Sequence, residues 1–226
     1  QVMLDAQEID EVKEEDGDEG RQRKPLKEDE ILSNCSIFFF AAYNTIGDAM
    51  AMTLFALANH PEVQAKILNE IANVIGDSDR CNYDQVKELY YLDKVLRESL
   101  RLYSPSQAAD RVCSEDVVIM GLKIPKGTVV SIPIHAVHMD PDNWPEPEKF
   151  NPERFRQEIN PYHWMPFGYG PRNCIGLRMA LIEMKIALVH LVKNFEIKLC
   201  EPNQQMERNK MTGSPVDLKL MVERRF

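Results

Sequence analysis

The fold is decided by one stretch of ten residues, Phe167-Gly168-Tyr169-Gly170-Pro171-Arg172-Asn173-Cys174-Ile175-Gly176. Its cysteine, Cys174, comes directly before a long segment in which apolar residues recur at helical spacing. The N–H groups at the start of a helix lack intrahelical partners and carry partial positive charge, so this position favours a thiolate over a thiol. Cys174 is therefore a candidate metal ligand.

Glycines and an arginine surround this cysteine. Gly168, Gly170 and Gly176 would let the backbone approach a flat ligand closely, where a Cβ would collide. Arg172 supplies a planar guanidinium that suits a carboxylate. Together these features fit haem, with sulfur on the iron and a propionate on the arginine. The loop taken alone leaves a second interpretation open, in which the cysteine is an ordinary buried thiol.

The fixed positions of this loop, F-x-x-G-x-R-x-C-x-G, match the signature of the cytochrome P450 family. From about Asp29 onward the chain resembles the C-terminal, haem-binding half of an animal microsomal member of the 3A type. The segments 57–64, 124–127 and 148–155 carry the same resemblance. It implies a mainly α fold with small antiparallel β sheets. It also implies that haem b is bound by Phe167, Gly168, Gly170, Arg172, Cys174 and Gly176, with Cys174 on the metal.

The resemblance also assigns roles to four charged residues. Arg111 would hold a haem propionate, although an exposed arginine at a strand edge is the alternative. Glu98 and Arg101 form an E-x-x-R pair that would join Arg154 in a buried triad. That triad would be structural and would hold the irregular segment 140–172 beneath the haem. The pair alone would fit a solvent-facing helix equally well.

A long helix carries Ala41, Ala42, Asn44 and Thr45 where the family usually has [A/G]-G-x-[D/E]-T. The resemblance gives Asn44 and Thr45 catalytic roles and places the two alanines against the haem. Thr45 would relay a proton during oxygen activation. Asn44 replaces an acid and cannot donate and recover a proton in the same way, and Ala42 adds a methyl group in place of glycine. Asp48, one turn further on, fills no family role.

The resemblance implies a monooxygenase that inserts one oxygen atom from O2 into a lipophilic, drug-like or steroid-like molecule. Electrons would come from NADPH through a flavin reductase, with cytochrome b5 as a further candidate partner, and Arg178 and Lys185 are candidates for the docking face. The expected location is the cytoplasmic face of the endoplasmic reticulum membrane, with attachment through the N-terminal half. Substrate-facing positions should include Phe38, Ala41, Thr45, residues 106–109 and Gly213-Ser214.

Two other functions stay open at this point. The asparagine at position 44 would also suit a haem-thiolate isomerase that rearranges peroxides without oxygen or NADPH. A truncated form that holds no haem would not be an enzyme and would at most bind partners. Turnover that requires NADPH would exclude the isomerase, and a protein without a Soret band would favour the non-catalytic form.

Charge and cysteine content further narrow the classes of protein to which this chain could belong. Residues 1–30 hold 12 acids and 5 bases, a net charge of −7, so only −2 of the total −9 remains for the rest of the chain. Nucleic-acid binding is therefore not expected. The five cysteines are widely spaced and odd in number, which predicts neither a disulfide framework nor a structural zinc site. We interpret 1–27 as an acidic linker or loop together with the end of a preceding helix, and 28–226 as part of a haem domain within a longer protein.

Periodicity and turn residues predict four main helices, at 28–59, 61–75, 89–103 and 175–195, with a short segment capped by Asn82. Strands are predicted at 116–120, 128–132, 195–199 and 216–222, the last two antiparallel, and 140–172 is irregular. The helix 28–59 is long enough to span a bilayer. Its central polar residues, Asn44, Thr45 and Asp48, favour a buried core helix instead.

Overall fold

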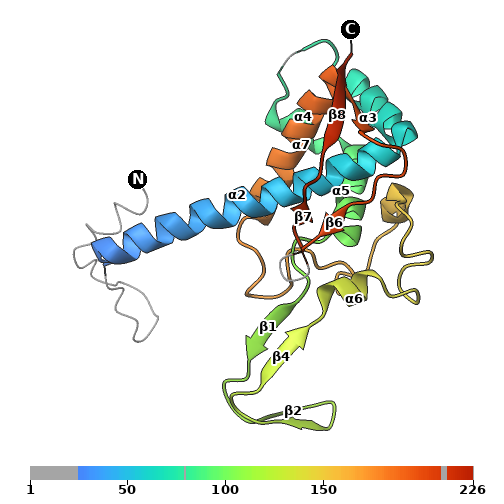
Figure 1. Ribbon diagram of the computed structural model, residues 1–226. Coiled ribbons are helices and arrows are strands. Elements are labelled where there is room, and N and C mark those ends of the chain that lie inside the picture. The colour runs from blue at the N-terminus through green and yellow to red at the C-terminus, as the bar shows by residue number, and fades with distance from the viewer. Residues whose placement is uncertain (1–24, 79, 210–212, 226) are drawn as a thin grey trace. The chain divides into compact units, whose positions relative to one another are not determined.

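The computed structural model describes residues 25–78, 80–209 and 213–225. Its helices in these ranges are α2 (Glu28–Asn59), α3 (Pro61–Val74), α4 (Tyr83–Lys87), α5 (Tyr90–Leu102), α6 (Ile134–His138), η1 (Pro152–Arg156) and α7 (Leu177–Asn194). Its strands are β1 (Ala109–Val112), β2 (Val117–Ile119), β3 (Leu122–Ile124), β4 (Val129–Ile132), β5 (Phe195–Leu199), β6 (Glu207–Arg208), β7 (Pro215–Val216) and β8 (Leu220–Arg224) (Figure 1).

The chain divides into two compact units, residues 1–44 and 45–226, with the boundary inside α2. The acidic linker expected at 1–27 lies outside the described residues except for positions 25–27, so that assignment stays a prediction. In the first unit, α2 begins with three acids, and the Lys27 N–H donates a hydrogen bond to the Glu30 carboxylate at 2.8 Å. Acids in the first turn favour the start of a helix because they face its positive end.

Helix α2 is buried along only part of its length. In the second unit, Met52 and Leu57 have no exposed surface, as expected for a core helix. In the first unit, Phe39 is 80% exposed and Tyr43 is 83% exposed, so the burial expected for the whole helix is not found there. By length and composition α2 is the one described helix that could cross a membrane.

The core of the second unit lies where α2, α3, α5 and α7 pack together (Figure 1). Helix α5 presents Leu92, Val95, Leu96 and Ser99 to this core, and each is at most 1% exposed. These residues recur at the three- and four-residue spacing of one helix face, which is why this segment folds as predicted. Most of the core side chains are aliphatic, and each Å² of apolar surface that they bury stabilises the fold by roughly 25 cal/mol.

Buried polar groups connect the core elements. Gln64 of α3 donates to the carbonyl oxygens of Leu57 and Ile197, both at 2.8 Å, and accepts from the Ile197 N–H. The Glu70 carboxylate accepts the backbone N–H groups of Tyr91 and Leu92 at 2.6 and 2.9 Å. Because the first N–H groups of a helix have no partner within the helix, Glu70 caps the start of α5 from a neighbouring helix.

The described strands form small antiparallel pairs, β1 with β4, β2 with β3, β5 with β8, and β6 with β7. The mainly α fold with small antiparallel β sheets is thus confirmed. One strand boundary was wrong. Val216 belongs to β7, and the partner of β5 begins at Leu220, because Asp217 adopts a positive φ of 47° between them and interrupts the extended chain.

Candidate haem-binding site

The cysteine loop folds back on itself just before α7. The Cys174 N–H donates to the Phe167 carbonyl at 2.8 Å, and the Asn173 N–H donates to Gly170 at 3.1 Å. Gly168 and Gly170 have φ of +70° and +84°, in the left-handed region that a side chain disfavours. These backbone bonds leave the Cys174 side chain exposed, as a free thiol. The loop therefore presents one sulfur outward at the start of a helix.

Gly176 differs from the other two glycines in its backbone conformation. It is the residue before α7 and has a negative φ of −85°, so its backbone would accept a side chain. A Cβ at this position would lie 3.9 Å from the Cys174 sulfur, at ordinary van der Waals distance. The described residues therefore leave room for a Cβ here, and close approach to a ligand stays a prediction for Gly176.

Two arginines lie beside the loop. Arg111 of β1 donates through Nη1 to the Asp110 carbonyl at 2.8 Å and through Nη2 to the Arg172 carbonyl at 3.5 Å. Both arginines are exposed. A guanidinium recognises a carboxylate through two parallel N–H groups. The structure thus brings Arg111 to the cysteine loop, where it and Arg172 could bind carboxylates of one ligand.

The residues of this loop fit a haem group. Cys174 is an exposed free thiol, the type of donor expected of a haem-thiolate site, and its sulfur would hold the haem iron. Helix α7 begins at Leu177, three residues after Cys174. The two arginines would bind the propionates. No group of three or more His, Cys, Asp or Glu residues in the described ranges suggests a different metal centre. Haem would be held chiefly by Cys174.

Glu98 meets both arginines assigned to the triad. Its carboxylate pairs with Arg101 Nε at 2.7 Å and with Arg154 Nε at 3.2 Å, and neither Glu98 nor Arg101 has exposed side-chain surface. The Asn151 N–H also donates to this carboxylate at 2.9 Å. Arg101 reaches further, to the His138 carbonyl at 2.8 Å. A buried carboxylate with these partners has each of its oxygens occupied.

The triad continues into the irregular segment between α6 and α7. Arg154 donates to the carbonyls of Pro145 and Glu146. Phe155 then contacts Trp164 at a ring-centroid distance of 6.0 Å, and Trp164 contacts Phe167 at 6.4 Å. This chain of contacts runs from the ion pairs to the first residue of the cysteine loop. Through these contacts the triad could hold the cysteine loop in position, which is the structural role predicted for it.

His138 is a buried contributor that the sequence analysis missed. Its Nε2 accepts the Met165 N–H at 2.8 Å, and its side chain is fully buried. Burial lowers the pKa of His138 to about 4, and the nearby Arg101 charge acts against protonation as well. Its position in a short helix between prolines gave no periodic signal, so only the tertiary contacts identify it.

We expect the intact protein to lose stability in acid because the folded state favours the neutral form of His138. Its pKa of about 4 lies below the unfolded value of about 6.5. The unfolded chain therefore binds more protons, and stability is fully present above pH 6.5 and falls as the pH drops toward 4, by about 3 kcal/mol. Urea unfolding at several pH values measures this loss.

His138→Gln keeps an acceptor for the Met165 N–H but cannot titrate, so we expect it to flatten this part of the pH profile. His190→Gln is the matched control, because His190 is exposed on α7. An unchanged profile in the His138 variant would show that another group causes the acid loss.

The residues predicted for oxygen activation lie on α2 and are exposed. Ala41, Ala42 and Asn44 belong to the first unit, and Thr45 is the first residue of the second. Their approach to the cysteine loop stays a prediction. Lys185 is a correction, because its amine is paired with Asp93 at 2.8 Å and its side chain is only 10% exposed, which leaves it unsuited to docking. Arg178 is exposed.

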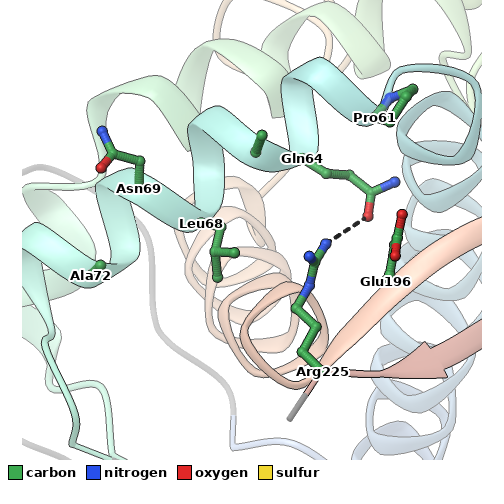
Figure 2. A pocket seen from close by; sticks show the side chains of 8 residues that line it. Pro61, Gln64, Leu68, Asn69, Ala72, Glu196 and Arg225 are labelled. Atoms are coloured by element: carbon green, nitrogen blue, oxygen red, sulfur yellow. Dashed lines mark hydrogen bonds between the residues drawn. The ribbon is translucent and has the colours of Figure 1, made fainter.

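A pocket of about 420 Å³ lies elsewhere, between α3 and the end of the β5–β8 pair (Figure 2). Gln64 and Arg225 meet in it at 3.5 Å. None of the residues predicted for haem or oxygen chemistry lines this pocket. The chemistry expected of the chain is therefore associated with the cysteine loop.

The fold and the loop together are typical of one class, mainly helical proteins that hold haem through a cysteine just before a long helix. The cytochrome P450 family model matches residues 1–221. Curated relatives include cytochrome P450 3A31 of Mesocricetus auratus (46% identical), 3A13 of Mus musculus (48%) and 3A29 of Sus scrofa (45%), each over 185 residues and 80% of this chain. The chain belongs to the cytochrome P450 family. It spans 37% of the length of these relatives.

Proposed function

We propose that the intact protein is a haem-thiolate monooxygenase, with haem b bound through Cys174. The observation that carries this proposal is the exposed Cys174 thiol in the turn before α7, within a loop that matches the family signature at every fixed position. The family match over 221 residues supports the same assignment. When bound, haem supplies the redox chemistry that activates oxygen.

Different residues of the chain would then bind the haem and position the proton donor. Cys174 would ligate the iron, while Arg111 and Arg172 would pair with the propionates. Thr45 would hold a proton donor in place through its hydroxyl group. Asn44 can orient that hydroxyl by hydrogen bonding, but its amide does not exchange a proton as a carboxyl does.

The substrate we propose is a lipophilic small molecule, drug-like or steroid-like. Electrons would come from NADPH through a flavin reductase, with cytochrome b5 as an additional partner, and Arg178 is the remaining candidate for their docking face. We place the protein at the cytoplasmic face of the endoplasmic reticulum membrane. The 3A relatives support this proposal as a whole, and the small or apolar side chains at the predicted substrate-facing positions, such as Ala41 and Gly213, support the choice of substrate.

Turnover by the intact protein should require both NADPH and oxygen. With purified reductase and a lipophilic probe such as progesterone, we expect product formation to fall to background when either NADPH or O2 is left out. Product that carries one atom of labelled oxygen from ¹⁸O2 identifies the insertion step. Oxygen-independent conversion of an organic hydroperoxide, with no NADPH requirement, would instead assign the isomerase function that Asn44 left open.

A further inference from the structure

A short hydrogen bond joins α2 to the segment before β7. The Ser214 hydroxyl donates to Oδ2 of Asp48 at 2.5 Å, between residues 166 positions apart. Both residues are partly buried. A hydrogen bond to an ionised carboxylate is typically stronger than one between neutral groups. Asp48, which has no part in the family motif, therefore ties a distant segment to the long helix.

Arg208 anchors the same segment on its other side. Its Nε donates to the Gly213 carbonyl at 2.7 Å, and its Nη2 donates to the Ser104 carbonyl at 2.9 Å. The Gly213 N–H donates to Asn209, and the Asn209 N–H donates to Ser214, both at 2.8 Å. The segment is thus held both at the end of α5 and at α2, by side chains from two different elements.

Electrostatics links the two anchors. Burial lowers the pKa of Arg208, and the neighbouring Tyr103 and Asp48 oppose that shift. The Asp48 carboxylate therefore balances a half-buried cation in addition to accepting the Ser214 hydroxyl. An asparagine at this position would keep an acceptor oxygen and lose the charge.

Gly213 shows how closely this segment packs. Its φ is +74°, and a Cβ there would lie 2.8 Å from Nε2 of Gln107 and 3.1 Å from Nη2 of Arg208. Glycine is needed for both reasons. Gln107 belongs to the segment 106–109, so two stretches predicted to face the substrate are in direct contact.

Asp48 lies three residues after Thr45 on α2, and residues at that spacing are neighbours on a helix surface. We propose that Asp48 is a positioning residue. Its bond to Ser214 fixes Gly213 and Ser214 beside the Thr45 turn, and this sets which carbon of a lipophilic substrate is presented for oxidation. The proposal rests on the proposed function, because only a substrate-oxidising site has such an orientation to set.

Amide hydrogen exchange in the intact protein tests the tie independently of turnover. We expect Asp48→Ala and Ser214→Ala each to speed exchange of the Asn209 and Gly213 amides about 10-fold. The double variant should be no faster than either single variant, since both remove one interaction. Asp48→Asn should recover part of the protection. Additive effects in the double variant, or unchanged exchange in both singles, would overturn the proposal.

Ser36→Ala is the matched control for these variants. Its hydroxyl also belongs to α2 but bonds only to the Leu32 carbonyl within the helix among the contacts described, at 2.9 Å. We expect this change to leave exchange at Asn209 and Gly213 as in the parent. Acceleration by Ser36→Ala would mean that general loosening of α2, and not the Asp48–Ser214 bond, sets the exchange rates.

The product distribution tests the role in catalysis. With progesterone as the probe, Asp48→Ala should change the ratio of hydroxylated products by at least about 3-fold, with the carbon monoxide spectrum of the reduced protein unchanged. Asp48→Asn should shift the ratio less. The same ratio in parent and variants would overturn the inference alone. A parent that oxidises no probe would remove the proposed function, and the inference with it.

Discussion

Replacing Cys174 by serine is expected to lower NADPH-dependent oxidation by the intact protein at least about 100-fold. Even partners in the outer shell of a metal site typically contribute 10- to 100-fold to affinity or activity, so the loss of the residue that would hold the iron should have a larger effect. A serine hydroxyl would also be a weaker electron donor than a thiolate to a bound haem, and the haem would then supply less oxygen-activating chemistry. Product formation per bound haem measures the change.

Cys200→Ser is the matched control, because Cys200 is another exposed free cysteine and lies after β5. We expect this control to keep the activity of the parent. Haem content must be measured for both variants, since the serine variant is expected to hold haem more weakly. A Cys174 variant that keeps most of its activity per haem would contradict the assignment of the ligand.

Removing the Glu98 carboxylate is expected to destabilise the protein by about 3–5 kcal/mol, because it leaves the fully buried Arg101 cation without its main partner. Glu98→Ala also removes the acceptor of the Asn151 N–H and releases Arg154. The segment that leads to the cysteine loop should then loosen, so haem content should fall as well. Urea unfolding and the haem-to-protein ratio measure the two effects.

Asp84→Ala provides the comparison for an exposed ion pair. Asp84 pairs with Lys87 at 3.3 Å on the surface of α4, and such pairs contribute about 0–1 kcal/mol. We expect the control to lose less than about 1 kcal/mol and to keep its haem. If Glu98→Ala cost no more than Asp84→Ala, the triad would not be the structural element described.

The long periodic helices could be predicted from the sequence because their signals are local. Helix α5 follows its apolar spacing from Tyr90 to Leu102, within one residue of expectation at each end. The short helix α4 follows Asn82, whose side chain and that of Gln85 form a capping box. In these cases one stretch of chain contains both the pattern and the reason for it.

The short strands could not all be predicted, because their sequences are not distinctive. Strands β1 and β3 were missed, and all but one residue at the end of each is exposed, so neither has the alternation of a half-buried strand. The pairing of β1 with β4 joins residues that the chain separates by a whole hairpin. Helix α6 is only five residues long and begins after Pro133, with no apolar period to mark it.

In the candidate site, too, some residues are identified by a local sequence pattern and others only by tertiary contacts. The loop motif identified Cys174 and Arg172 directly, and the family resemblance identified Glu98 and its arginines. The contacts of His138 with Met165 and of Asp48 with Ser214 join residues 27 and 166 positions apart, and no local pattern contains them. These contacts form only in the tertiary fold.

The ligation of haem iron by the Cys174 sulfur is tested most directly by the absorption spectrum of the reduced, carbon-monoxide-bound intact protein. The account predicts a strongly red-shifted Soret band of the thiolate type in the parent and in Cys200→Ser, and its loss in Cys174→Ser. A parent without that band, or a Cys174→Ser protein that keeps it, would contradict the account.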